Sequence, residues 1–153
     1  MTYVDRHRAS VRVSPERAWE VVGHLGGDPR FYVPRRLWRV RLLSDLVFGG
    51  PGFTLTGPDR RLRVGDRMDF WEVVAAEPPA RLRLRALSSL PGTADVEISL
   101  RPAGAGSELS VRTEFDPRGL AGHGYWLSSL AAHTVVFELM TRRLAAMIEQ
   151  GTA

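Results

Sequence analysis

The sequence predicts an α+β fold in which a curved antiparallel sheet wraps around a long C-terminal helix. Three features support this prediction. Residues 121–149 carry apolar side chains at helical spacing and contain no proline, and residues 68–115 contain several segments that alternate with period two. A helix-start signal also follows the first alternating segment near the N-terminus. Because sequential antiparallel strands precede one long amphipathic helix, we expect that helix to cover the sheet.

The N-terminal elements are predicted to be a strand and one or two short helices. Residues 8–13 alternate, with three apolar side chains on one face, which is typical of a strand. Ser14 is followed by proline and glutamate, a pattern that begins a helix with Ser14 as its N-cap. Residues 35–48 keep helical spacing up to a Gly-Gly-Pro-Gly segment and predict the second helix.

The middle of the chain predicts a meander of strands. Residues 68–75 form a strand with apolar side chains on both faces, so its inward face stays open. Residues 81–86, 94–100 and 109–115 alternate more strictly, and a glycine-rich loop separates the last two. The final helix then presents an apolar stripe that passes through His133 and consists of Trp126, Leu130, Phe137, Met140, Leu144 and Ile148. A sheet curved around one helix leaves space for a pocket of the size that small apolar ligands use.

The composition excludes several kinds of chemistry. The 153 residues have the length of a single domain, and no linker or repeat divides them. The absence of cysteine excludes disulfides, thiolate nucleophiles and zinc–thiolate sites, and all 21 basic residues are arginine, which excludes a Schiff-base lysine. The histidines have no carboxylates at metal-ligand spacing, so we expect neither a metal nor another cofactor.

No segment has the length and hydrophobicity that a membrane or a signal peptide requires. The N-terminus lacks the apolar core of a signal peptide, and the longest nearly apolar run, residues 127–140, is too short to cross a bilayer. We therefore expect a cytoplasmic protein without membrane insertion. The sequence leaves open whether it is a monomer or a homodimer.

The net charge of +4 is concentrated in the first part of the chain. Five arginines occur between residues 30 and 41 without an intervening acid. They fit a solvated helix face, or a contact with a small anion or an acidic partner. Because no recognised reading motif accompanies them, we expect no nucleic-acid partner.

Several short motifs occur together in this chain. They are Ser-Pro-Glu-Arg-Ala-Trp from Ser14, Leu-Trp-Arg-Val-Arg from Leu37, Asp-Phe-Trp from Asp69, Phe-Asp-Pro-Arg-Gly-Leu from Phe115, and Tyr125 and Trp126 ahead of His133 and Phe137. With the element order, they resemble the helix-grip fold of the START, Bet v 1-like and polyketide cyclase (SRPBCC) superfamily. Within it they are similar to a bacterial branch of unknown function, often fused behind NAD(P)-binding Rossmann-type domains. This resemblance implies a hydrophobic pocket but no established reaction.

The chain departs from the pattern of that branch in two places. Residues 86–89 read Ala-Leu-Ser-Ser where the branch tends to carry Ala-Glu-Met-Lys, and Asp95 stands where it tends to have an aromatic residue. Any function of that glutamate or lysine is therefore absent or replaced here. No glycine fingerprint of a Rossmann-type domain follows a strand.

Four residues are candidates for acid–base chemistry. His133 is either a general acid or base whose pKa is lowered by desolvation, or a core histidine hydrogen-bonded to a carbonyl or a carboxylate. Asp69, Glu72 and Glu97 lie in strands that can face the core, where a carboxylate is costly unless it is paired, for instance with Arg39. Each is either a raised-pKa acid or ligand-orienting group, or part of a structural ion pair.

Ligand contacts are expected mainly from aromatic side chains. These side chains either pack the core or line a pocket for a flat ligand, with tyrosine hydroxyl and indole N–H groups as polar handles. The candidate ligand-binding residues are Tyr32, Trp38, Arg39, Phe70, Trp71, Glu72, Tyr125, Trp126, Leu130 and Phe137.

The resulting functional hypothesis is a cofactor-independent enzyme of secondary metabolism. It binds a hydrophobic small molecule between sheet and helix and catalyses its cyclisation or isomerisation, with His133, Asp69 or Glu97 as the acid–base group. Two alternatives remain: a non-catalytic carrier or sensor of a hydrophobic ligand, and a protein-interaction module. An entirely apolar cavity favours the carrier, whereas a filled core with an exposed apolar sheet face favours the interaction module.

Overall fold

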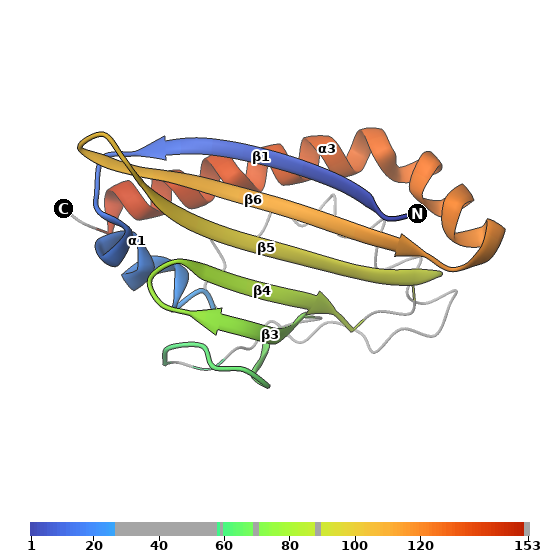
Figure 1. Ribbon diagram of the computed structural model, residues 1–153, viewed down its shortest axis with the longest axis horizontal. Helices are drawn as coiled ribbons and strands as arrows, with labels where there is room; N and C mark the ends of the chain where they lie inside the picture. Colours follow the sequence, from blue (N-terminus) through green and yellow to red (C-terminus); the bar gives the residue numbers. More distant parts are fainter. Residues whose placement is uncertain (27–57, 59, 69–70, 88–89, 152–153) are drawn as a thin grey trace.

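The computed structural model describes residues 1–26, 58, 60–68, 71–87 and 90–151, so the predicted helix over residues 35–48 lies outside it. The described elements are β1 (Tyr3–Val11), α1 (Pro15–Val22), β2 (Arg67–Met68), β3 (Trp71–Glu77), β4 (Arg81–Ala86), β5 (Gly92–Ala103), β6 (Gly106–Pro117) and α3 (Gly119–Gln150). The described strands form one antiparallel sheet in the order β1-β6-β5-β4-β3-β2. Figure 1 shows α3 running along this sheet beside β1 and β6, with α1 near its C-terminal end. The predicted α+β fold class is confirmed.

Strand β1 begins five residues earlier than the alternation of residues 8–13 predicts. It pairs with β6 along its whole length, from Tyr3 opposite Phe115 to Val11 opposite Ser107. This pairing supplies backbone hydrogen bonds that a short apolar pattern does not reveal. Side chains alternate between faces, so the extended strand places Asp5 and His7 on the same face as the buried Val11.

The predicted single strand over residues 68–75 is wrong. Met68 at the end of β2 pairs antiparallel with Trp71 at the start of β3, so the chain reverses direction between them. Trp71 and Val73 are buried in the core, whereas Glu72 lies opposite Arg85 on the other face of the sheet. Period-two alternation continued across the reversal and therefore did not reveal it.

The core is aliphatic at the C-terminal end of α3. Here Met140, Leu144, Met147 and Ile148 pack with α1 and with the inner side chains of the sheet. Leu130 was predicted to share this buried stripe, but it is 41% exposed. Leu130 and Ile148 are 18 residues apart, about five helical turns, and so lie on the same side of the helix. Among the described helices, only α1 packs beside α3, and it does so at the Ile148 end.

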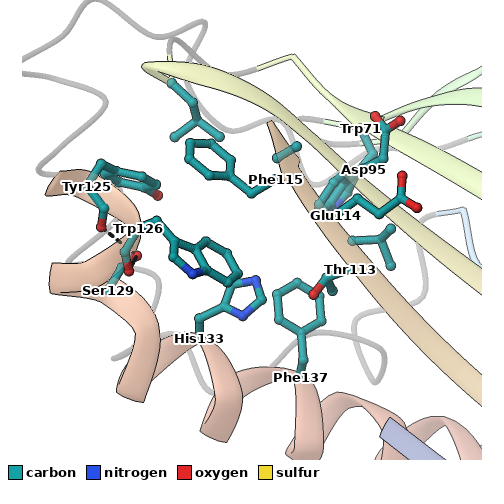
Figure 2. A pocket seen from close by; sticks show the side chains of 13 residues that line it. Trp71, Asp95, Thr113, Glu114, Phe115, Tyr125, Trp126, Ser129, His133 and Phe137 are labelled. Atoms are coloured by element: carbon teal, nitrogen blue, oxygen red, sulfur yellow. Dashed lines mark hydrogen bonds between the residues drawn. The ribbon is translucent and has the colours of Figure 1, made fainter. Parts of the chain in front are cut away.

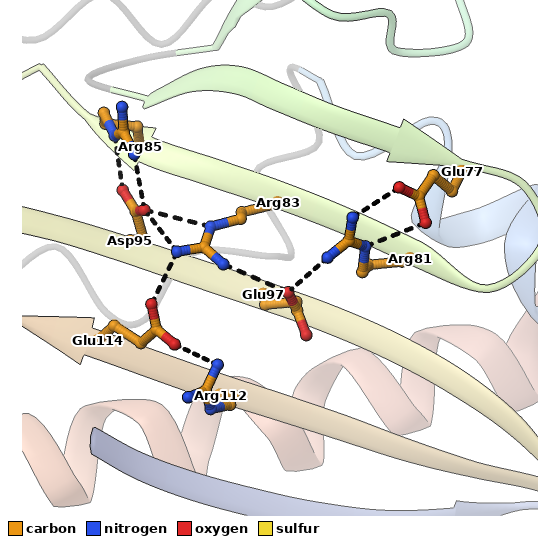
Figure 3. A network of polar contacts seen from close by, with 8 residues as sticks. All are labelled: Glu77, Arg81, Arg83, Arg85, Asp95, Glu97, Arg112 and Glu114. Atoms are coloured by element: carbon orange, nitrogen blue, oxygen red, sulfur yellow. Dashed lines mark hydrogen bonds and ion pairs between the residues drawn. The ribbon is translucent and has the colours of Figure 1, made fainter.

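The outer face of the sheet carries a network of ion pairs (Figure 3). Asp95, whose side chain is 7% exposed, accepts hydrogen bonds from Arg83 and Arg85 at 2.8–3.2 Å. Glu114 accepts a further hydrogen bond from Arg83 at 2.7 Å. Burial by itself would raise the pKa of the Asp95 carboxyl, but the hydrogen bonds from Arg85 and Arg83 outweigh it and hold this pKa below its ordinary value. The network therefore stabilises the ionised carboxylate.

The start of α3 approaches the sheet closely at Gly122. A Cβ atom built there would lie 2.4 Å from the Pro91 carbonyl oxygen and 2.7 Å from the Pro117 Cβ. By contrast, a Cβ atom at Gly124, two residues later, would meet no atom within 4 Å. The first turn of α3 thus rests directly on the ends of β5 and β6 through a position that only glycine fills without displacement.

We expect Asp95→Asn to reduce the free energy of unfolding by about 2 kcal/mol at pH 7, because charge-assisted hydrogen bonds to two arginines are lost. The folded-state pKa of Asp95 is depressed, so its contribution is complete above the ordinary value of 3.8 and is lost as pH falls through the lowered value. Urea unfolding of both proteins from pH 7 to pH 2 should show the difference shrinking below about pH 4. A pH-independent difference would contradict this origin of the stability.

We expect Gly122→Ala to destabilise the protein by about 1–3 kcal/mol, because the added methyl group forces α3 away from the sheet. Gly124→Ala is the matched control, and it should stabilise the protein by up to about 1 kcal/mol because it removes glycine from an exposed helical position. Urea unfolding of the two variants checks both signs. Equal effects would show that the first turn of α3 does not rest on the sheet.

Candidate functional site

A cavity of about 40 Å³ lies between the sheet and the N-terminal half of α3. Figure 2 shows the side chains that surround it. From α3 it is lined by Tyr125, Trp126, Ser129, His133 and Phe137. From the sheet it is lined chiefly by Trp71, Val96, Thr113 and Phe115. The aliphatic core described above begins beyond Phe137, so the cavity occupies the end of the trough where α3 begins.

Aromatic rings form most of the cavity wall. Trp126 stacks between Tyr3 and Phe115, with ring centroids 5.2 Å and 5.6 Å away and interplanar angles of 15° and 10°. Tyr125 contacts Phe115 at a tilt, 5.6 Å between centroids. The hydroxyl of Tyr3 lies 2.9 Å from His123 Nδ1, which fixes the outer ring of the stack. These contacts make a flat, apolar surface suited to planar or conjugated groups.

Thr113 supplies a polar atom in this apolar wall. Its side chain is 2% exposed, and its Oγ1 makes no hydrogen bond with any described residue. A buried hydroxyl without a partner costs about 1–3 kcal/mol, so such an atom is uncommon in a folded protein. Figure 2 places the Thr113 side chain beside Phe137 at the cavity. A bound molecule with a hydrogen-bonding group at this position would satisfy the hydroxyl.

His133 lies between two aromatic rings at the cavity. Its ring centroid is 4.7 Å from that of Trp126 and 4.5 Å from that of Phe137. Its Nδ1 faces the Asp5 carboxylate, with 3.9 Å between Nδ1 and Oδ2. Asp5 comes from β1 and lies directly opposite Thr113 in the sheet. An imidazole held by aromatic rings with a carboxylate behind one nitrogen can accept or donate a proton at its other nitrogen.

The structure brings together five of the eight predicted site residues that it describes. His133, Trp71, Tyr125, Trp126 and Phe137 line the cavity, although nothing tests their roles in binding or catalysis. The predicted residues that lie outside the described part of the chain are Tyr32, Trp38, Arg39, Asp69 and Phe70.

Three predicted site residues lie away from the cavity. Glu97 forms ion pairs with Arg81 and Arg83 at 3.4 Å and 3.6 Å on the outer face of the sheet (Figure 3). Glu72 is on the same outer face, and Leu130 does not line the cavity. Strand alternation directs the Glu72 and Glu97 carboxylates away from α3. Glu97 therefore fits the predicted alternative of a structural ion pair. Glu72, Glu97 and Leu130 are not part of the site.

Sequence reasoning missed three polar residues near His133, which are Asp5, His7 and Thr113. Thr113 lies within the predicted strand over residues 109–115, where a threonine fits the strand pattern without indicating a site. Asp5 and His7 precede the predicted strand over residues 8–13. The available signal was the period of two, because counting back from Val11 places both side chains on the inner face.

Within the described ranges, no group of three or more histidine, aspartate or glutamate side chains is arranged to hold a metal ion. No helix in the same part of the chain is long and apolar enough to cross a membrane. The side chains at the cavity are instead aromatic, hydroxyl and imidazole groups. They are suited to apolar contact and to proton transfer.

Solved structures share this fold at low sequence identity. Norcoclaurine synthase from Thalictrum flavum, in complex with a transition-state analogue, superimposes with a TM-score of 0.62 at 14% identity, over 100% of this chain and 98% of that chain. KanY gives 0.64 at 10% identity, over 97% and 99%. DynU16, from the dynemicin biosynthetic locus, gives 0.59 at 22% identity, over 97% of this chain and 48% of that chain. At these identities the likeness shows the helix-grip, Bet v 1-like fold alone.

Sequence comparison identifies two relatives and a family. The chain is 29% identical over 127 residues to the uncharacterised proteins MT1597 and Rv1546 from two strains of Mycobacterium tuberculosis, which covers 83% of this chain and 84% of each relative. Relatives matched over that share of their length give no support to the fusion with Rossmann-type domains that the resemblance implies for the branch. The family model of DUF2867, proteins of unknown function, matches residues 1–140. The chain therefore belongs to the DUF2867 family.

Proposed function

We propose that this protein binds a hydrophobic small molecule in the cavity beside α3 and catalyses its cyclisation or isomerisation. The observation that carries the proposal is the combination of aromatic walls with two polar side chains, Thr113 and His133, at one buried space. Ligand sites characteristically combine a mainly apolar lining with a few placed polar groups. The bound molecule is thus expected to have an apolar, conjugated body and at least one hydrogen-bonding oxygen or nitrogen.

The volume of the cavity restricts how binding occurs. About 40 Å³ accommodates one or two water molecules, whereas pockets for drug-sized ligands measure roughly 300–1,000 Å³. Binding of a larger molecule therefore requires lining side chains to move apart. Tyr125 is partly exposed and its ring contacts Phe115 at a tilt, so its rotation opens the cavity and gives up this ring contact. A ligand that replaces this ring against Phe115 would recover the lost contact.

Catalysis in such a site would rest on enclosure and on one proton-transfer group. Cyclisation and isomerisation can proceed by moving a proton between substrate atoms, without an external oxidant or reductant. Aromatic walls exclude water and hold a substrate folded, while His133 accepts the proton from one atom and returns it to another. Ser129 is a poor nucleophile candidate because its hydroxyl already donates to the backbone carbonyls of Tyr125 and Trp126.

Comparison with the alternatives supports an enzyme. A carrier would be favoured by an entirely apolar cavity, but this one contains a hydroxyl and an imidazole. An interaction module was expected to expose an apolar outer sheet face, whereas the described part of that face carries the arginine–carboxylate network. Two proteins of the same fold, norcoclaurine synthase and DynU16, are by their names a synthase and a product of a biosynthetic locus. They support a biosynthetic role for this chain.

The decisive experiment is native mass spectrometry of the protein purified from its own host, followed by turnover of the molecule that co-purifies. We expect His133→Phe to abolish turnover, because phenylalanine keeps the ring contacts with Trp126 and Phe137 but transfers no proton. His24→Phe, at an exposed histidine outside the cavity, is the matched control and should keep the wild-type rate. Full turnover in His133→Phe would exclude the acid–base role, and bound ligand without turnover in the wild type would establish the carrier.

We expect Thr113→Val to increase the free energy of unfolding by about 1 kcal/mol, because a methyl group replaces a buried hydroxyl that lacks a partner among the described residues. The same substitution should weaken binding of a ligand whose polar group contacts that hydroxyl, by about tenfold. Thermal unfolding and fluorescence titration with 2-naphthol, a flat hydroxyl-bearing probe, measure the two effects. Destabilisation with unchanged probe affinity would show that Thr113 has a structural role only.

A further inference from the structure

A chain of titratable groups leads from His133 to the protein surface along the seam between β1 and α3. It lies outside the cavity, and the proposed function does not use it. Asp5 and His7 project from β1 toward α3, while Arg6 and Arg8 alternate onto the opposite, solvent-exposed face. Glu138 of α3 completes the chain. The side chains of His133, Asp5, His7 and Glu138 are 19%, 24%, 9% and 40% exposed, so Glu138 is the most exposed end of the chain of groups.

Each of these groups lies close in space to the next one along the seam. His133 Nδ1 lies 3.9 Å from Asp5 Oδ2, and the same Asp5 oxygen lies 2.9 Å from His7 Nε2. His7 Nδ1 lies 2.8 Å from Glu138 Oε2. Two of the three contacts are thus at hydrogen-bond distance, and the first needs to shorten by about 1 Å to reach it. A small rotation of the Asp5 or His133 side chain supplies that change.

The chemistry of His7 makes this arrangement able to pass a proton. Ionised carboxylates only accept hydrogen bonds, so two such bonds to Asp5 and Glu138 require an N–H on each ring nitrogen of His7. With a neutral His7 ring, one of the two carboxyl groups must carry the proton instead. One proton can therefore reside on Asp5, His7 or Glu138 without any heavy atom leaving its partner.

Other charged and polar groups at the seam are compatible with this role. Arg142 donates to the remaining Glu138 oxygen at 2.8 Å, and the Thr134 hydroxyl lies 3.5 Å from Asp5 Oδ2. The hydrogen bond from His7, followed by that from Arg142, lowers the pKa of the Glu138 carboxyl. Glu138 therefore releases a proton to solvent readily once it has received one.

We propose that Asp5, His7 and Glu138 form a proton relay that connects His133 in the cavity with solvent. When His133 takes a proton from a bound molecule at Nε2, it passes the proton on Nδ1 to Asp5. His7 keeps its Nε2–H on Asp5 and passes the proton on Nδ1 to Glu138, and Glu138 releases it to water. One proton enters and one leaves, and the reverse sequence supplies a proton to the cavity. The relay rests on the proposed function only in giving His133 a substrate.

The test follows the His133 ring by NMR in histidine-labelled protein without any ligand. We expect Glu138→Gln and His7→Gln to slow exchange of the His133 ring N–H proton with water by about tenfold or more, the rate effect of losing one charge-assisted hydrogen bond. Asp5→Asn should slow this exchange as well, because an uncharged amide at position 5 cannot accept the proton from His133. The matched control is Glu108→Gln, a carboxylate that is 38% exposed and faces Arg8 at 3.9 Å.

The relay and a purely structural clamp predict different results. A clamp would lower the melting temperature of the variants and leave the exchange rate at His133 in the folded protein unchanged. Unchanged exchange in Glu138→Gln, whose side chain is already partly exposed, would overturn the relay even if His7→Gln does not fold. Slowed exchange in Glu108→Gln would overturn it as well, because the effect would then not depend on the seam.

The outcome also separates the relay from the proposed function. The exchange measurement uses no substrate, so slowed exchange in the seam variants supports the relay even if no molecule co-purifies with the protein. If His133→Phe abolishes turnover while exchange is unaffected by the seam variants, the enzyme hypothesis stands and the relay fails.

Discussion

The packing of α3 against the sheet at both of its ends is the constraint on which the site depends. At its start, Gly122 lets the first turn rest on Pro91 and Pro117. At its end, aliphatic side chains around Leu144 and Ile148 pack with α1 and the sheet. A helix of 32 residues is roughly 48 Å long, so these two contacts hold it rigidly over the intervening strands. The side chains between them need not fill the trough completely, and the cavity lies there.

The two faces of the sheet use charged groups in different ways. On the outer face, arginines and carboxylates face one another across neighbouring strands, and Asp95, Glu97 and Glu114 each pair with two arginines. On the inner face, Asp5 is partly exposed beside α3 and His7 is buried there, where an unpaired charge would be costly. They are retained in a set of contacts that ends at the partly exposed Glu138. If Asp5, His7 and Glu138 had a purely structural role, none of them would need to lie close to His133. A role in proton transfer requires that proximity.

Neither the fold nor the family assigns a function, so the functional hypothesis depends on the residues that line the cavity. Structures at 10–22% identity share the architecture, and the DUF2867 family has no assigned activity. One fold commonly supports many activities, because activity depends on the few side chains that line the pocket. In this chain those side chains are an aromatic stack, the Thr113 hydroxyl and an imidazole backed by a carboxylate. They differ from the glutamate and lysine expected in the branch that the sequence resembles.

Local patterns determined the elements of this protein, but not which side chains meet. The alternation in Arg81–Ala86, the N-cap at Ser14 and the helical spacing through Gly119–Gln150 are local, and the corresponding predictions are confirmed. They also placed His133 and Trp126 on the inner side of α3. The predicted site residues outside α3 depended on which face of a strand points inward, or lie outside the described part of the chain.

Tertiary structure decided the rest, because inward and outward faces depend on distant partners. Pairing of β1 with β6 brought Asp5 and His7 under α3, although Tyr3–His7 has no apolar alternation of its own. The sheet register turned Glu97 toward arginines on the outer face. The position of α1 covered Ile148 but left Leu130 exposed, although both lie on one side of the helix. A period of 2 or 3.6 divides an element into faces, and only long-range packing determines which face is buried.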